Sequence, residues 1–200
     1  MDLDSGQTLA HRLAAGTVTL EDLARDRAPM AVALVIDCSG SMYGRNIDEA
    51  RKAATAFVER TLGPNRNIGV VAFPGGVQCP LNNDPRRLRD ALAALTPIGS
   101  TPMAEGLTAA RELMKSRAGV QRVFVLLTDG HPDDPDAAAA EVHRVRSQGG
   151  RVVTIGVGQQ VHQDYLRGLA SRPSDFHFCN ESVELQGTFI NLATELAQGG

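Results

Sequence analysis

The chain has 200 residues, which suits one domain with a full-sized core, and no Pro-rich or Ser-rich linker divides it. Its formal net charge of -3 comes from interspersed acidic and basic residues, so no basic stripe is present that would follow a phosphate backbone. The composition therefore excludes nucleic acid as the main partner. It also lacks a polybasic membrane signal, and we expect no direct membrane contact.

The number and spacing of the cysteines indicate whether the chain resides in an oxidising or a reducing compartment. The three cysteines are odd in number and follow no CxxC spacing, which argues against a disulfide framework and against a zinc site. The acidic N-terminus also lacks the layout of a signal peptide, although a piece of a longer secreted protein would look the same. We therefore expect a reducing, cytoplasmic compartment.

The first strong element follows an N-terminal extension. Residues 1–29 contain two short helical patterns, near 8–14 and 19–24, and Pro29 closes this predicted helical segment. The apolar run 31–36 is long enough for one buried strand and too short for a membrane span. Asp37 follows it directly, at the edge of an α/β sheet where ligands bind.

Strand and helix patterns then alternate to the end of the chain. This alternation predicts a doubly wound α/β fold, in which helices cover both faces of a mostly parallel sheet. The expected strands are 67–73, 77–81 as an antiparallel edge strand, 123–128, 151–157 and 176–178. The expected helices are capped by Asn46, Asp84, Thr101 and Asp134, with a short helix near 165–169 and a closing helix over 182–198.

Oxygen-bearing side chains occur at three ends of these elements. Asp37, Ser39 and Ser41 follow the first strand, Thr101 precedes a helix, and Asp129 ends a later strand. Carboxylates and hydroxyls are hard donors, which favour Mg²⁺, Mn²⁺ or Ca²⁺ over metals that seek sulfur or imidazole. Each residue alone also suits a helix cap or a turn. Their joint occurrence in this order favours a metal site.

Together, the Asp-Cys-Ser-Gly-Ser run at 37–41, Thr101 and the Thr-Asp-Gly run at 128–130 resemble the metal-ion-dependent adhesion site (MIDAS) of the von Willebrand factor A (VWA) domain family. The resemblance covers about residues 30–198. It implies a Rossmann-like three-layer sandwich with a six-stranded sheet and one antiparallel edge strand. In bacteria, intracellular members of this family work beside ATPases, chelatases or stress and defence assemblies, and we expect this chain among them.

The resemblance also implies roles for the site residues. The metal, Mg²⁺ or alternatively Mn²⁺ or Ca²⁺, would be contacted by the hydroxyls of Ser39, Ser41 and Thr101. Asp37 and Asp129 would act directly or through water. An Asp or Glu of a partner protein would then complete the metal shell, because a hard cation gains from a charged oxygen in a partly dried interface.

Three further residues are candidates for a rim that contacts the partner. Tyr43 and Arg45 follow the first metal motif, and both residue types are favoured at interface centres. His131 follows the Thr-Asp-Gly run within a loop that otherwise reads as solvated and acidic. Tyr43 and Arg45 are equally compatible with an ordinary surface role, and for His131 the ordinary role in a solvated loop is favoured. We expect Met42 and Met103 to be partly buried beneath the same loops, and Cys38 to be a small buried residue.

We expect a binding module and not an enzyme. Ser39 stands where a phosphatase of the haloacid-dehalogenase type needs a second acid, and GxSxG, P-loop and GxGxxG patterns are absent. Two alternatives remain open. One is a metal-assisted hydrolase at the same site, with His131 as its base. The other is a mainly structural subunit of an ATPase-linked or stress and defence complex. The oligomeric state is not indicated.

Overall fold

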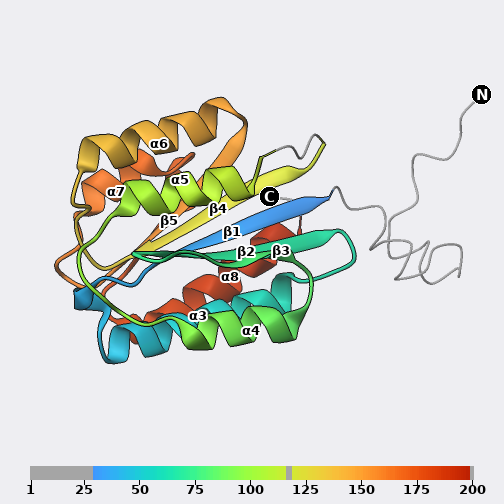
Figure 1. Cartoon of the computed structure of the whole chain (residues 1–200), viewed down its shortest axis with the longest axis horizontal. Helices are drawn as coiled ribbons and strands as arrows, with labels where there is room; N and C mark the ends of the chain where they lie inside the picture. The colour runs from blue at the N-terminus through green and yellow to red at the C-terminus, as the bar shows by residue number, and fades with distance from the viewer. Residues whose placement is uncertain (1–28, 116–118, 199–200) are drawn as a thin grey trace, which may run out of the picture.

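A computed structural model of the chain describes residues 29–115 and 119–198 (Figure 1). The predicted helical extension lies outside these ranges, except for Pro29. The elements are β1 (Met30–Asp37), η1 (Gly40–Met42), α3 (Arg45–Thr61), β2 (Arg66–Phe73), β3 (Gly76–Asn82), α4 (Pro85–Ala94), α5 (Met103–Leu113), β4 (Gln121–Thr128), α6 (Pro135–Ser147), β5 (Gly150–Val157), α7 (Gln163–Leu169), η2 (Pro173–Asp175), β6 (Phe176–Cys179), η3 (Ser182–Glu184) and α8 (Leu185–Ala197).

The strands form a six-stranded sheet in the order β3-β2-β1-β4-β5-β6. β3 pairs antiparallel with β2, and the other pairings are parallel, as the sequence predicts. β1 lies at the centre, between β2 and β4. The parallel strands therefore end at one common edge, on the left in Figure 1, which we call the carboxyl edge. This edge is where a doubly wound sheet places ligand-binding loops.

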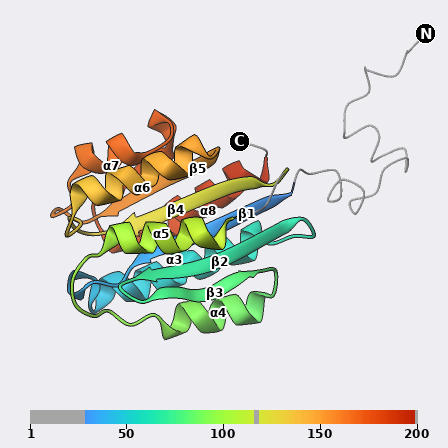
Figure 2. The same ribbon diagram turned by 45° about the horizontal axis from the view of Figure 1, so that its top comes forward.

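Helices cover both faces of the sheet (Figures 1 and 2). One apolar core packs α3, α4 and α8 against one face, and a second packs α5, α6 and α7 against the other. In β1, Val32 and Leu34 belong to the first core, whereas Ala33 and Val35 belong to the second. Because successive side chains of a strand point to opposite faces, a strand buried on both sides needs an unbroken apolar run.

Two predicted helix caps are present, and two predicted helix starts are wrong. Asp84 and Asp134 accept backbone N–H bonds at the starts of α4 and α6, each ahead of a proline. Asn46, however, lies within the first turn of α3, which follows Gly44 at a φ of 80° and has no side-chain cap. Thr101 is likewise not the cap of α5. Pro102 holds that position, and the helix begins at Met103.

A buried ionic cluster lies at the opposite end of the sheet from the carboxyl edge. Arg151, at the start of β5, is only 8% exposed and places Nη2 at 2.6 Å from Oδ1 of fully buried Asp175. The same guanidinium donates to Glu195 in the last turns of α8. His177 lies nearby in β6, where burial lowers its pKa. The cluster thus ties the C-terminal helix α8 to the start of β5 and to η2, which directly precedes β6.

The three cysteines, Cys38, Cys79 and Cys179, are buried and unpaired. Burial, reinforced by the Asp37 carboxylate, raises the pKa of the Cys38 thiol to about 12. Cys38 is therefore the inert, small buried residue that the sequence predicts. Met42 and Met103 are completely buried, which corrects the expectation of partial burial. Across the described ranges, no helix is both long and apolar enough to cross a membrane.

Candidate metal centre

Asp37 is the last residue of β1, and its side chain is completely buried. The backbone N–H of Ser39 donates a hydrogen bond of 2.8 Å to its Oδ1. The Thr128 hydroxyl, at the end of β4, donates a hydrogen bond of 2.5 Å to its Oδ2. Since both carboxylate oxygens are held, the orientation of Asp37 is fixed before any ligand binds.

Ser39, Ser41 and Asp129 continue from Asp37 as one polar chain. The Oγ atoms of Ser39 and Ser41 lie 3.0 Å apart, and Ser41 Oγ donates to Asp129 Oδ1 at 2.7 Å. Ser39 and Asp129 are buried, whereas Ser41 is exposed. The structure therefore brings four of the five predicted ligand side chains together and leaves one side of the cluster open to solvent.

Asn46 is a site residue that sequence reasoning missed. From the first turn of α3 it donates Nδ2 to Asp129 Oδ2 at 3.1 Å. An Asn shortly before an apolar helical stripe is typical of a helix cap. Nothing local in the sequence signals a contact that spans 83 residues. Asp129 thus accepts one bond on each oxygen, from Ser41 and from Asn46.

Thr101 reaches the same edge on a neighbouring loop. This loop is attached to the first metal motif through the N–H of Ile98, which donates to the Cys38 carbonyl at 2.7 Å, and through Gly99, whose carbonyl accepts from Gly40 N–H at 3.1 Å. The backbone of Thr101 exchanges two bonds of 3.0 Å with Asp133. Among the described residues, its hydroxyl makes no hydrogen bond to the other four predicted ligands, so it is held nearby but not joined to them.

The donor set and its electrostatics suit a hard cation. Burial is the main cause that raises the pKa of Asp37 to about 6, and the Asp129 carboxylate adds to this effect. A divalent cation between the two carboxylates would remove the cost of holding their charges together. In the described part of the chain, no three His, Cys, Asp or Glu side chains converge as a metal-ligating group. The cluster is therefore one of carboxylate and hydroxyl oxygens.

The predicted rim residues are all exposed on loops or helix starts beside this cluster. Tyr43 is 79% exposed at the end of η1, and Arg45 is the first residue of α3. His131 packs its ring against His162, with ring centroids 5.1 Å apart. The sequence did not predict this pairing, because His162 comes from the loop after β5, which is distant in the chain.

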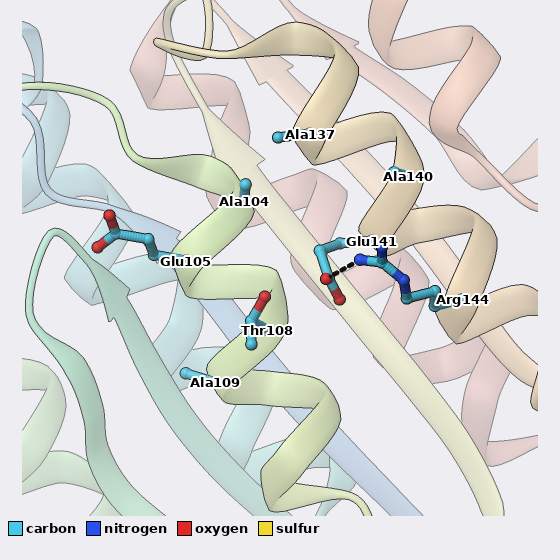
Figure 3. A pocket seen from close by; sticks show the side chains of 8 residues that line it. All are labelled: Ala104, Glu105, Thr108, Ala109, Ala137, Ala140, Glu141 and Arg144. Carbon is cyan, nitrogen blue, oxygen red and sulfur yellow. Dashed lines mark hydrogen bonds and ion pairs between the residues drawn. The ribbon is translucent and has the colours of Figure 1, made fainter.

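A separate hollow lies between α5 and α6, with a volume of about 430 Å³ (Figure 3). Small side chains form much of its lining, among them Ala104 and Ala140. Glu141 at its side is paired with Arg144 and with Arg111. None of the predicted metal ligands lines the hollow, so it is distinct from the metal centre.

The fold and the cluster define a doubly wound α/β domain with an oxygen-rich site at the carboxyl edge of its sheet. The chain belongs to the von Willebrand factor type A domain family, whose sequence model matches residues 31–191. The family expected from the Asp-Cys-Ser-Gly-Ser and Thr-Asp-Gly runs is therefore confirmed, and so is the fold class.

Curated relatives resemble the chain over parts of longer proteins. The uncharacterized protein sll0103 of Synechocystis is 27% identical over 208 residues, which cover all of this chain and 49% of that protein. Human matrilin-4 is 29% identical over 78% of this chain and 27% of its own length. The magnesium-chelatase 67 kDa subunit of Chlorobaculum parvum is 27% identical over 58% of this chain and 20% of its own length. The chain thus spans half or less of these relatives.

Solved structures share the fold. The von Willebrand factor domain of the pilus tip protein Mfa5 from Porphyromonas gingivalis gives a TM-score of 0.79 at 18% identity, covering 86% of this chain and 96% of that one. Proximal thread matrix protein 1 of the mussel byssus, solved with a zinc-occupied MIDAS motif, gives 0.74 at 26% identity, covering 84% and 46%. Manganese-loaded TRAP protein of Plasmodium vivax gives 0.66 at 22% identity, covering 82% and 74%.

Proposed function

We propose that this domain is a divalent-cation-dependent protein-binding module that captures an acidic side chain of a partner protein. The proposed metal ligands are Asp37, Ser39, Ser41, Thr101 and Asp129, and the proposed metal is Mg²⁺, with Mn²⁺ or Ca²⁺ as alternatives. The observation that carries the proposal is the hydrogen-bonded chain from Asp37 through Ser39 and Ser41 to Asp129 at the carboxyl edge.

The chemistry follows from the charges and the exposure of these residues. Two carboxylates balance a divalent cation, and neutral hydroxyls add oxygens without further charge. Thr128 and Asn46 hold the carboxylates in place, as outer partners of metal ligands commonly do. The exposed side at Ser41 leaves room for an outside ligand. A partner's Asp or Glu suits that position, because a charged oxygen strengthens a bond to a hard cation.

Similar proteins and the cysteines of this chain support the proposal. Zinc occupies the MIDAS motif of proximal thread matrix protein 1, and the TRAP protein is manganese-loaded, so both similar proteins bind a divalent cation. We further propose that the module works within an intracellular multiprotein assembly, which is in keeping with the similarity to a magnesium-chelatase subunit. The three buried, unpaired cysteines are in keeping with a reducing cytoplasm.

We favour binding over hydrolysis at this site. His131, the candidate base of the hydrolase alternative, is exposed and packs against His162. Within the described residues, it makes no hydrogen bond to Ser39, Ser41 or Asp129. A general base must reach the proton that it removes, directly or through one water molecule.

The test is a titration of the metal-free chain with Mn²⁺, in which binding is measured by calorimetry and by electron paramagnetic resonance. We expect one Mn²⁺ per chain, displaced by excess Mg²⁺, and loss of this site in Asp37→Ala and Asp129→Asn. The matched control is Asp164→Ala, which removes a carboxylate that is 88% exposed in α7 and should leave Mn²⁺ binding intact. Undiminished Mn²⁺ binding by Asp37→Ala would contradict the proposal.

A further inference from the structure

Exposed apolar side chains gather near the proposed metal centre. Four large ones are exposed among the described residues: Tyr43 at 79%, Ile98 at 57%, Val77 at 45% and Val183 at 43%. Tyr43, Ile98 and Val183 lie on loops or short turns at the carboxyl edge, and Val77 lies on the edge strand β3. In the described ranges, none lies at the opposite end of the sheet. Single exposed apolar residues are ordinary, but the grouping of Tyr43, Ile98 and Val183 on loops and turns at one edge marks an interaction surface.

Tyr43 and Ile98 stand on the two loops that also carry predicted metal ligands. The Tyr43 N–H donates to the Gly40 carbonyl at 3.2 Å, and Gly40 N–H donates to the Gly99 carbonyl at 3.1 Å. Ile98 N–H donates to the Cys38 carbonyl at 2.7 Å. Met42, directly before Tyr43, is completely buried and anchors the turn. Both exposed side chains therefore project from backbone that is already fixed, on loops bonded to each other.

This arrangement favours binding energetically. A tyrosine on fixed backbone loses little freedom when a partner covers it, and tyrosine is among the residues most often dominant in interfaces. The side chains of Tyr43 and Ile98 leave much of their apolar area exposed to water, where a partner could cover it. A partner that reaches the metal centre from solvent would approach these two loops, since they carry Ser41 and Thr101.

The loop that Asp133 joins to Thr101 by hydrogen bonds has a different character. The loop after β4 and the start of α6 expose three carboxylates, those of Asp133, Asp134 and Asp136. A partner segment with several neighbouring acids would be repelled there, whereas a single acid held by the metal would not. Apolar contact with Tyr43 and Ile98, together with repulsion by these neighbouring carboxylates, therefore selects among acidic partners.

Resting on the proposed function, we propose that the partner presents an isolated Asp or Glu beside an apolar side chain, and that Tyr43 and Ile98 contact this apolar neighbour. The bound metal makes partner binding depend on a cation, and the side chains of Tyr43 and Ile98 make it specific for a partner with an apolar neighbour. The partner chemistry is thus an acidic residue in an apolar segment, and not an acidic run.

The test uses a displayed peptide library with a central Asp or Glu and random flanking positions. Selection is carried out on the immobilised chain in Mg²⁺, and bound peptides are released with EDTA. We expect the released peptides to be enriched in an apolar residue within two positions of the acid and depleted in further acids. A selected peptide, labelled for fluorescence anisotropy, then serves as the probe for variants.

The variant that tests the contact is Tyr43→Ser combined with Ile98→Ser. We expect the peptide to bind at least ten-fold more weakly, while Mn²⁺ binding stays unchanged because neither residue is a proposed ligand. Val77→Ser is the matched control, since it removes an exposed apolar side chain on β3 and should change peptide affinity less than two-fold.

The outcomes separate the two proposals. Metal-dependent peptides with acidic runs, or a double variant that keeps its peptide affinity, would overturn the inference and leave the metal-dependent module standing. Peptides recovered equally well in EDTA, or none recovered in Mg²⁺, would contradict the proposed function and this inference together.

Discussion

Ser41 and Asp129 are 88 residues apart in the chain, yet the hydroxyl of one donates a hydrogen bond of 2.7 Å to the carboxylate of the other. The contact exists because β1 and β4 are parallel neighbours, with Ile36 opposite Leu127 at their ends. The residues that follow each strand therefore emerge side by side. Four consequences of this architecture are open to measurement.

Asp37→Asn should stabilise the metal-free protein at neutral pH. Burial raises the pKa of Asp37 in the folded state from its ordinary value of 3.8 to about 6, so folding favours the protonated carboxyl. Ionisation then costs stability as the pH rises from about 4 through 6. At pH 7.5 the cost is on the order of 1–3 kcal/mol, which an uncharged Asn avoids. The measurement is thermal unfolding in EDTA at a series of pH values.

The gain in Tm from Asp37→Asn should shrink as the pH falls from 7.5 to 4, where the wild-type carboxyl is protonated. Adding Mg²⁺ at pH 7.5 should raise the Tm of the wild type and leave that of Asp37→Asn unchanged. A gain in Tm that is constant across this pH range would show that burial of the Asp37 charge is not its cause.

Asn46→Ala should weaken Mn²⁺ binding roughly ten-fold, because residues that orient metal ligands have effects of this size. The change removes the 3.1 Å bond to Asp129 Oδ2, so that, among the described residues, only the bond from Ser41 still orients the carboxylate. Arg45→Ala is the matched control, since it alters the preceding, exposed position of the same helix turn. Equal Mn²⁺ affinities in the two variants would argue against an orienting role for Asn46.

Arg151→Met should destabilise the fold by about 3–5 kcal/mol, because it leaves the Asp175 carboxylate buried without its partner. The comparison is Arg172→Met. Arg172 is about half exposed and lies 3.6 Å from the same carboxylate, so its loss should cost less than about 1 kcal/mol. Urea unfolding at neutral pH measures both. A similar loss in the two variants would mean that Arg151 does not hold the cluster together.

Gly106→Ala and Gly187→Ala should have opposite effects, although both glycines lie in helices. A Cβ at Gly106 would meet Phe73 Cβ at 2.8 Å, so the added methyl group should cost about 1–3 kcal/mol. A Cβ at Gly187 meets nothing within 4 Å, so alanine should gain roughly 0.5–1 kcal/mol from its helix propensity. Urea unfolding distinguishes them, and stabilisation by Gly106→Ala would contradict the packing of α5 on β2.

The sheet could be predicted from the sequence because the patterns that indicate its strands are local. The unbroken apolar runs of β1, β4 and β5 report burial on both faces, and Asp84 and Asp134 ahead of prolines mark two helix starts. The cap expected at Thr101 was wrong by one position. Its backbone is instead engaged by Asp133, a contact across 32 residues that no local pattern encodes.

The candidate site was predictable only in part for the same reason. Asp37 ends β1 and Asp129 directly follows β4, and their place in the chain indicates the carboxyl edge. The roles of Thr128 and Asn46 depend on which strand ends are neighbours and on which way each side chain turns. The pairing of His131 with His162 likewise arises only when the loops after β4 and β5 meet.

Because Cys38, Cys79 and Cys179 are buried, the folded chain should react very slowly with thiol reagents. A single cysteine introduced at the exposed Tyr43 position would then be the one site that a maleimide dye modifies quickly. A dye at that position would sit beside the metal centre and report its occupation without any prior removal of native cysteines.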